Sequence, residues 1–185
     1  MLSELEPQGG RSMMSAARLR VLAMASLAAV LMMQGCSAPK PPPAAVVPAW
    51  TLEITVRTDL GLNPDARGRA APVVLRIYEL KVPQSFLAAD FFSLFEKDQS
   101  TLGADMASRE ELQLRPGDAA SLPSRELKPE VRAIGVFVAY RDIEKSRWRA
   151  LHLLPPPPAA TTTPPPKPIP VPVRVVVGAR EVTIE

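Results

Sequence analysis

Cysteine and histidine each occur only once in this 185-residue chain, and their scarcity excludes several kinds of site. The one cysteine, Cys36, cannot form a disulfide within the chain, so the fold must depend on its apolar core. One histidine and one cysteine cannot supply a metal site of the His and Cys type. His152 has no acidic cluster near it in the sequence, and a lone histidine is more often structural than catalytic.

The chain also lacks the sequence signatures of common enzymes and of nucleic-acid-binding proteins. It has no Gly-rich phosphate loop and no nucleophile elbow. Its acidic pairs, Glu110 with Glu111 and Asp142 with Glu144, lie where a strand edge or a turn would be solvated. Aromatic residues make up only 5% of the chain, and its basic residues are spread along it. We therefore expect no catalytic residue, no metal, no cofactor and no nucleic-acid partner.

No apolar run is long enough for a permanent membrane span, which needs about 20 residues. The main run, residues 21–33, is interrupted only by Ser26, follows Arg18 and Arg20, and ends just before Cys36. A basic segment followed by a short apolar run is typical of a signal peptide. We predict that residues 1–35 are this signal peptide.

The end of the run resembles a bacterial lipobox, although Met33 and Gln34 depart from its usual residues. This resemblance predicts that Cys36 becomes the first mature residue and carries several acyl chains. One acyl chain alone holds a protein at a membrane only marginally, so a multiply acylated cysteine makes the attachment durable. An ordinary secretory peptide or a buried cysteine is the alternative. No aspartate follows Cys36, and similarity to lipoprotein sorting therefore implies the periplasmic face of the outer membrane.

Proline is abundant, with 22 residues gathered mainly in two segments. Within the predicted tether, residues 36–48, the prolines exclude regular helix or sheet and favour polyproline II, in which the twelve residues 37–48 reach roughly 35 Å. We expect this segment to be a tether between the anchor and a folded domain. Residues 155–170 are the second segment and are predicted to form a solvated, extended loop.

The remaining chain, residues 49–185, alternates between apolar and polar residues in several short runs. The runs 50–56, 72–80, 109–114, 147–153, 173–177 and 182–184 are predicted strands. Residues 115–118 form a predicted turn, and 119–127 a weaker pairing strand that Pro123 places at an edge. Residues 131–141 are apolar on both faces and should be central. This pattern predicts an all-β, two-sheet β-sandwich.

A helical insertion is predicted between the second and third strands. It begins near Pro83 and Ser85 and carries one apolar stripe of four residues. The stripe consists of Leu87, Phe91, Leu94 and Phe95, and it is flanked by Phe86 and Phe92. The helix should end within 98–103, and a short turn is predicted over 102–106. We favour packing against the sheet over a partner-binding Phe patch.

The connection between the first two strands, residues 58–71, is rich in turn-forming residues and longer than a hairpin needs. Loops of this length are usually functional or disordered, and a simple floppy connection is the alternative.

Five fragments occur in the order of one known family: Asn63 before PVVLRIYEL, then FLAADFFSLFEKD, LGADM, LQLRPGD and AIGVFVAYRDIEKSRWR. Together with the lipobox and tether they resemble the type VI secretion outer-membrane lipoproteins (TssJ, VasD or SciN-like). The resemblance implies a transthyretin-like β-sandwich with an added helical element. It also implies binding to the periplasmic C-terminal domain of the inner-membrane protein TssM, which forms an envelope-spanning complex with TssL.

In that family the loop between the first two strands contributes to TssM binding. The exposed candidates here are Leu60, Leu62, Asn63, Asp65, Arg67 and Arg69. The 155–170 segment looks like a lengthened loop that departs from the family pattern. The competing hypothesis is a generic lipoprotein β-sandwich that binds a small solute or carbohydrate, which an apolar pocket with convergent polar groups would favour.

Overall fold

The computed structural model describes residues 48–156 and 167–185. The predicted signal peptide, Cys36, nearly all of the predicted tether and the middle of the 155–170 loop lie outside the described residues. Within the described ranges, no helix has the length and apolarity needed to cross a membrane.

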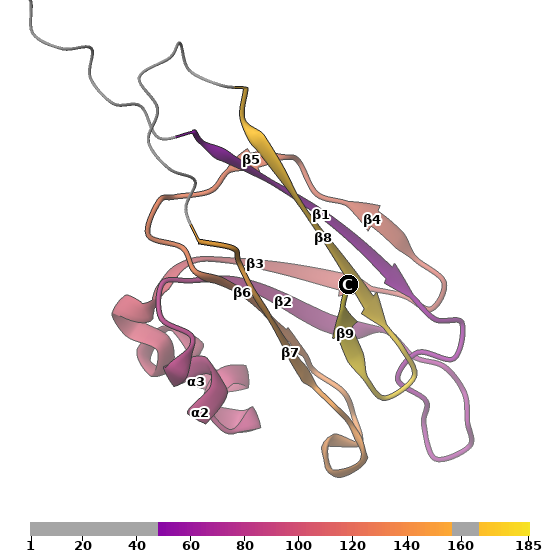
Figure 1. Cartoon of the computed structure of the whole chain (residues 1–185). Helices are drawn as coiled ribbons and strands as arrows, with labels where there is room; N and C mark the ends of the chain where they lie inside the picture. The colour runs from indigo at the N-terminus through magenta and orange to yellow at the C-terminus, as the bar shows by residue number, and fades with distance from the viewer. Residues whose placement is uncertain (1–47, 157–166) are drawn as a thin grey trace, which may run out of the picture. The chain divides into compact units, whose positions relative to one another are not determined.

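Two β-sheets pack face to face, which confirms the predicted two-sheet β-sandwich (Figure 1). The first sheet has the order β4 (Ala119–Ser121), β1 (Trp50–Thr58), β8 (Ile169–Val177) and β9 (Val182–Ile184), with β5 (Arg125–Glu126) also pairing with β1. The second has the order β3 (Met106–Leu114), β2 (Val73–Leu80), β6 (Ala133–Val138) and β7 (Arg149–Leu153). Strands β1 and β8 are parallel, and the other named pairs are antiparallel.

The sandwich core follows from the alternation along its strands. In β1, Leu52, Ile54 and Val56 are buried, whereas Glu53 and Arg57 between them are exposed. Strand β8 repeats the pattern with inward valines that lie in register with these residues. Period-two alternation gives each of these strands one buried face, and the outer face of β1 carries polar residues such as Glu53 and Arg57.

Strand β6 lies between β2 and β7 and is buried along its whole length, which confirms its predicted central position. Ile134 and Val136 enter the sandwich core, and Ala133 and Phe137 face the helices. Gly135 is needed here, since a Cβ at this position would lie 3.0 Å from Leu80 Cδ1 and 3.1 Å from the ring of Phe86.

The segment 119–127 is an edge, as predicted, but it does not pair with the strand that precedes it. Strand β4 pairs with β1, whereas β3 pairs with β2. The turn at residues 115–118 therefore carries the chain from the second sheet to the first. A hydrogen bond of 3.1 Å from Asp118 N to Arg115 O closes that turn.

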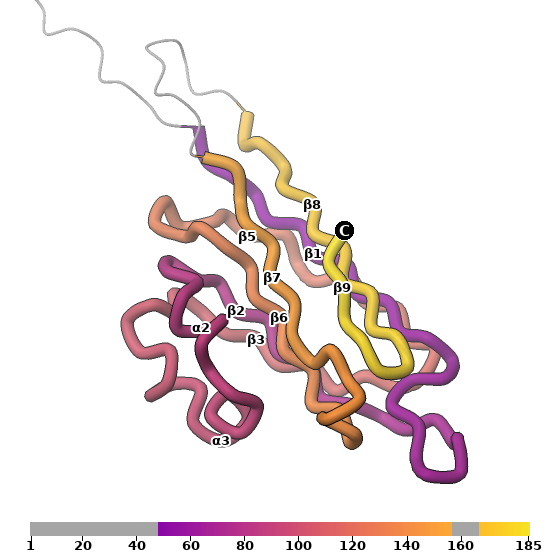
Figure 2. The backbone as a smooth tube through the Cα atoms, turned by 60° about the horizontal axis from the view of Figure 1, so that its bottom comes forward, coloured from indigo at the N-terminus to yellow at the C-terminus, as the bar shows by residue number. Residues whose placement is uncertain are grey.

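The helical insertion lies between β2 and β3 and covers part of the outer face of the second sheet (Figures 1 and 2). It consists of α2 (Gln84–Ala88), α3 (Phe91–Leu102) and a 3-10 turn, η1 (Gly103–Asp105). The predicted single stripe is wrong because the helix breaks before Asp90, which caps α3 by accepting a hydrogen bond from Ser93 N at 2.9 Å. The break buries Phe86 completely and leaves Leu87 exposed. The predicted helix end and following short turn are confirmed.

A buried carboxylate holds α3 against the sheet. Asp98 is 5% exposed and accepts hydrogen bonds from Tyr78 Oη at 3.0 Å and Arg109 Nη1 at 2.9 Å. Arg76 pairs with Asp98 at 3.4 Å and also donates to two carbonyls of α3. Burial alone would raise the pKa of Asp98, but hydrogen bonds from Arg109 and Tyr78, with the charges of Arg109 and Arg76, hold it below its usual value.

Candidate functional site

Four connections meet at one end of the sandwich (Figure 2). They are the β1–β2 loop (59–72), the β3–β4 turn (115–118), the β6–β7 connection with its 3-10 turn η2 (Ile143–Lys145), and the β8–β9 turn (178–181). Hydrogen bonds link them directly. Thr58 N donates to Asp118 O at 2.9 Å, Asn63 N to Ala179 O at 3.1 Å, and Arg147 N to Arg180 O at 2.8 Å.

Asn63 fixes the base of the β1–β2 loop. Its backbone has φ of 46°, a left-handed conformation that asparagine tolerates better than most residues. Its side-chain Nδ2 donates to Pro72 O at 2.9 Å, and its Oδ1 accepts from Arg141 N at 2.9 Å. One buried amide therefore joins both ends of the loop to the β6–β7 connection.

Leu62 is completely buried in the sandwich core, and Asn63 is 5% exposed. The expectation that these two side chains are exposed is therefore wrong. Loop composition predicts solvent exposure on average, but a long loop has to be attached to the core at some point, and this pair makes that attachment. The local sequence around Leu62 and Asn63 gave no signal of this role.

Asp65 shapes the tip of the loop. Its carboxylate accepts from Arg67 N at 2.8 Å, Arg69 N at 2.9 Å and Arg69 Nε at 2.8 Å. These hydrogen bonds, led by that from the Arg69 backbone, lower the pKa of Asp65 below its usual value. Gly68, at φ of 77°, completes the turn. The connection thus has internal structure, and it does not fit the alternative of a floppy link.

Of the six predicted residues, Leu60, Arg67 and Arg69 are exposed. Leu60 is 82% exposed, although it leans on the β3–β4 turn, where its Cδ2 would lie 3.0 Å from a Cβ at Gly117. Arg69 is held by Asp65 but remains largely exposed. Three of the six predicted residues are therefore exposed, whereas Asp65 shapes the loop and Leu62 and Asn63 attach it to the sandwich.

Tyr140 holds the β8–β9 turn next to the loop. Its hydroxyl, nearly buried, donates to the carbonyl oxygens of Gly178 at 3.1 Å and Glu181 at 2.7 Å. Burial, followed by the charges of Glu181 and Asp59, raises the pKa of Tyr140. The hydroxyl therefore stays protonated as a hydrogen-bond donor across the physiological range.

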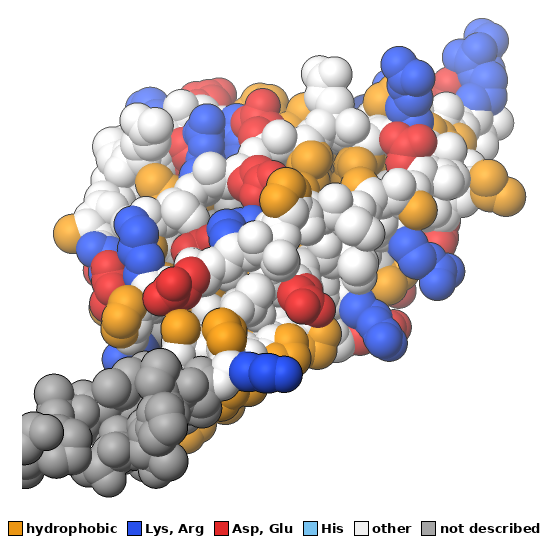
Figure 3. All heavy atoms as spheres, turned by 90° about the horizontal axis from the view of Figure 1, so that it is seen from above, with side chains coloured by type: hydrophobic (Ala, Val, Ile, Leu, Met, Phe, Trp, Pro, Cys, Tyr) orange, Lys and Arg blue, Asp and Glu red, His pale blue; other side chains and the backbone are white. Residues whose placement is uncertain are grey.

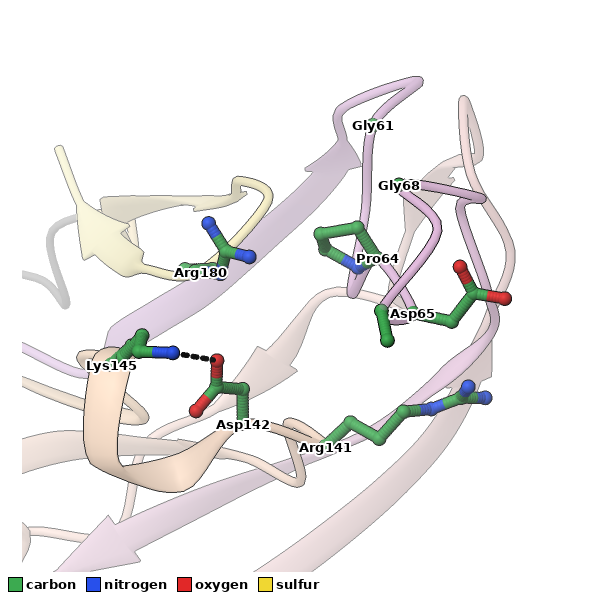
Figure 4. A pocket seen from close by; sticks show the side chains of 9 residues that line it. Gly61, Pro64, Asp65, Gly68, Arg141, Asp142, Lys145 and Arg180 are labelled. Carbon is green, nitrogen blue, oxygen red and sulfur yellow. Dashed lines mark ion pairs between the residues drawn. The ribbon is translucent and has the colours of Figure 1, made fainter.

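An open cleft of about 920 Å³ lies between the loop, η2 and the β8–β9 turn (Figure 4). Three cationic side chains, Arg141, Lys145 and Arg180, line it, together with Asp65 and Asp142. Lys145 pairs with Asp142 at 3.5 Å. The cleft is thus a polar, charged surface between protruding loops.

Among the described residues, no group of three or more His, Cys, Asp or Glu side chains is arranged to hold a metal ion. On the face shown in Figure 3, acidic and basic side chains of the described residues are interspersed. That distribution is unlike the basic stripe of a nucleic-acid-binding surface.

A family model described as type VI secretion lipoprotein (VasD, EvfM, TssJ) matches residues 50–178. The chain belongs to this family. The match confirms the resemblance found in the sequence and covers β1 to β8, with three of the four connections at this end and the first residue of the β8–β9 turn. No curated protein sequence matches the chain at a significant level.

Solved structures support the assignment to the type VI secretion lipoproteins. The T6SS lipoprotein TssJ1 from Pseudomonas aeruginosa is 33% identical, with a TM-score of 0.64, over 75% of this chain and 96% of that one. Serratia marcescens Lip, described as a membrane bound component of the type VI secretion system, is 25% identical, with a TM-score of 0.62, over 76% and 97%. A chain in a structure described as the T6SS protein TssM C-terminal domain from EAEC is 25% identical, with a TM-score of 0.55, over 73% and 97%.

Sequence reasoning missed the cationic residues of the cleft in this family member. Arg141 lies 78 positions after Asn63, and Arg180 follows in a separate turn. Nothing in their local sequence distinguishes them from other exposed arginines, because only the sheet pairing brings the connections together.

Proposed function

We propose that this type VI secretion lipoprotein is anchored in the outer membrane through acylated Cys36 and binds the periplasmic C-terminal domain of TssM. Through TssM it would be joined indirectly to TssL. The observation that best supports binding is the structured β1–β2 loop, whose base is fixed by Asn63 while Leu60, Arg67 and Arg69 remain exposed. The similarity to a chain in a structure of the TssM C-terminal domain points to the same partner.

The proposed mechanism is mechanical. The predicted tether reaches the domain at the start of β1, and the loop follows the end of the same strand. Because β1 has nine residues at about 3.3 Å each, the loop lies roughly 30 Å from the point where the tether joins. A stiff sandwich of this length would transmit force between lipid and partner and would perform no chemical step.

The alternative, binding of a small solute or carbohydrate, has less support. Such sites are usually apolar recesses that enclose most of the ligand. The cleft at the loop end is open and is lined by charged side chains and backbone. This surface suits a protein partner better.

Anchoring is tested by Cys36→Ser, with secretion of a known substrate of the system as the readout. The variant domain should be folded and soluble in the periplasm, and secretion should be lost. Secretion at the normal level from the unacylated protein would refute anchoring as the function.

Binding is tested by titrating purified TssM periplasmic domain with Leu60→Asp and Arg67→Glu/Arg69→Glu. We expect each to weaken the affinity by about tenfold or more, because exposed apolar and arginine side chains often dominate protein interfaces. Thr55→Asp, on the exposed face of β1, is the control and should bind normally. Unchanged affinity in both loop variants would place the interface elsewhere.

A further inference from the structure

A second hollow adjoins the cationic cleft and shares Arg141 with it. This groove, of about 390 Å³, lies on the outer face of the second sheet beside α3. Its apolar lining consists of Pro72, Val73, Val74, Phe95 and Ala139, and its polar lining of Asn63, Gln113 and Arg141. The cleft and the groove together form one surface that passes around the base of the β1–β2 loop.

The groove exists because the helices cover only part of this face. Tyr78, Leu80 and Phe137 pack beneath α2 and α3, whereas Ala139 packs at the edge of this cluster and Val74 lies outside it. Phe95 forms the wall and is 41% exposed. It is held in place by stacking on Phe91 at 5.8 Å between ring centroids, with the Arg76 guanidinium 5.7 Å from its ring. The wall is therefore a preorganised aromatic surface.

The cleft next to the groove contains cationic side chains that are not used in ion pairs. The carboxylates of Asp65 and Asp142 are paired with Arg69 and Lys145. Across residues 48–156 and 167–185, neither Arg141 nor Arg180 has an ion-pair partner. Both are exposed, and Figure 4 shows them on different sides of the cleft. The charge of Arg141 helps to lower the pKa of Asp65, but no direct ion pair joins the two, so an incoming carboxylate could be bound by either guanidinium without breaking an existing pair.

We infer that this surface binds an extended, acidic segment of the partner protein, with an apolar side chain in the groove against Phe95 and carboxylates on Arg141 and Arg180. The inference rests on the proposed function and specifies the chemistry of the partner. A recess that continues into a charged cleft suits an extended peptide. A bilayer would instead be contacted by protruding apolar side chains.

The direct test uses three fluorescent ten-residue peptides titrated into the soluble Cys36→Ser protein: alternating Glu and Leu, alternating Lys and Leu, and alternating Glu and Ser. We expect the Glu–Leu peptide to bind at least about tenfold more tightly than the other two. Its affinity should fall about tenfold or more in Arg141→Glu/Arg180→Glu. Lys128→Glu/Arg174→Glu makes the same change in net charge on exposed residues elsewhere and should bind as the parent does.

Gln113 gives a test that avoids the packed aromatic side chains. It is exposed at the groove, so Gln113→Lys should tighten binding of the Glu–Leu peptide and Gln113→Glu should weaken it, each by about two- to fivefold. Equal binding of Glu–Ser and Glu–Leu peptides would refute the apolar groove. If neither the double arginine variant nor the Gln113 variants change the affinity of the Glu–Leu peptide, the whole inference is refuted. It is also refuted if the protein binds phosphatidylglycerol vesicles through Arg141 and Arg180 and binds none of the peptides.

The TssM periplasmic domain separates this inference from the proposed function. If it binds the parent protein and Arg141→Glu/Arg180→Glu equally well, the proposed function stands and the inference fails. If it does not bind the parent at all, the proposed partner is wrong, whatever the peptides show. Loss of TssM binding in the arginine variant, but not in Lys128→Glu/Arg174→Glu, supports both.

Discussion

The β1–β2 loop and the helical insertion flank the same strand, β2, but they are attached to the sandwich in different ways. The loop is fixed at its base by Leu62 and Asn63, and its tip projects. The helices are held along their length by buried side chains such as Phe86 and Leu94 and by the ion network around Asp98. An insertion anchored only at its base can present side chains to a partner, whereas one anchored along its length mainly stabilises the sheet.

The largest effect should come from removing the charge that holds α3. Asp98→Ala leaves Arg76 and Arg109 without their buried partner, and we expect the free energy of unfolding to fall by about 3 kcal/mol. Urea denaturation of the Cys36→Ser protein measures this loss. Asp98→Asn, which keeps a hydrogen-bond acceptor for Tyr78, is the matched control and should lose less. A loss below about 1 kcal/mol in Asp98→Ala would mean that apolar packing alone holds the helices.

Asn63→Ala should lower the free energy of unfolding by about 2 kcal/mol. The variant leaves Pro72 O and Arg141 N without their buried partner, and it places alanine in a left-handed backbone conformation. Asn63→Gly removes the same hydrogen bonds but adopts the backbone freely, so the difference between the variants isolates the strain. Both should also weaken TssM binding, since the loop base is released. Normal affinity in both would show that the tip does not depend on its base.

Acid should reduce the stability contributed by the attachment of the helices more strongly than the stability contributed by the base of the loop. Asp98 has a lowered folded pKa, so the stability that it contributes is fully present above the ordinary carboxyl pKa of about 3.9 and is lost as the pH falls through the folded value. The free energy of unfolding, measured from pH 6 to about pH 2, should fall faster in the parent protein than in Asp98→Asn once the pH is below about 4. Parallel pH profiles would assign the acid sensitivity to other carboxylates.

The smallest effects should come from the exposed side chains of each insertion. Phe92→Ala, at a position 56% exposed, and Leu60→Ala should each change the free energy of unfolding by less than about 0.5 kcal/mol. Only Leu60→Ala should weaken TssM binding. An equal loss of affinity in Phe92→Ala would make the helical insertion part of the interface and would erase the functional distinction between the two insertions.

The strands could be predicted because their signal is local. Alternation in β1 and β8 and the two-sided apolar run of β6 gave the right elements and the right central strand. The helix register could not be predicted in the same way. A stripe assumes one continuous helix, and the Asp90 cap restarts the helix, so Phe86 and Leu87 exchange their expected environments.

The order of residues in this chain was sufficient to determine its sandwich class, its family and the loop that precedes β2, and it is the basis of the prediction that Cys36 is acylated. Each of these depends on composition or spacing within a short segment. The tertiary structure alone decided that Leu62 and Asn63 are anchors and that Arg141 and Arg180 line one cleft. The physical reason is that burial and charge at the loop end are set by four connections distant in sequence, which become neighbours only when the strands pair.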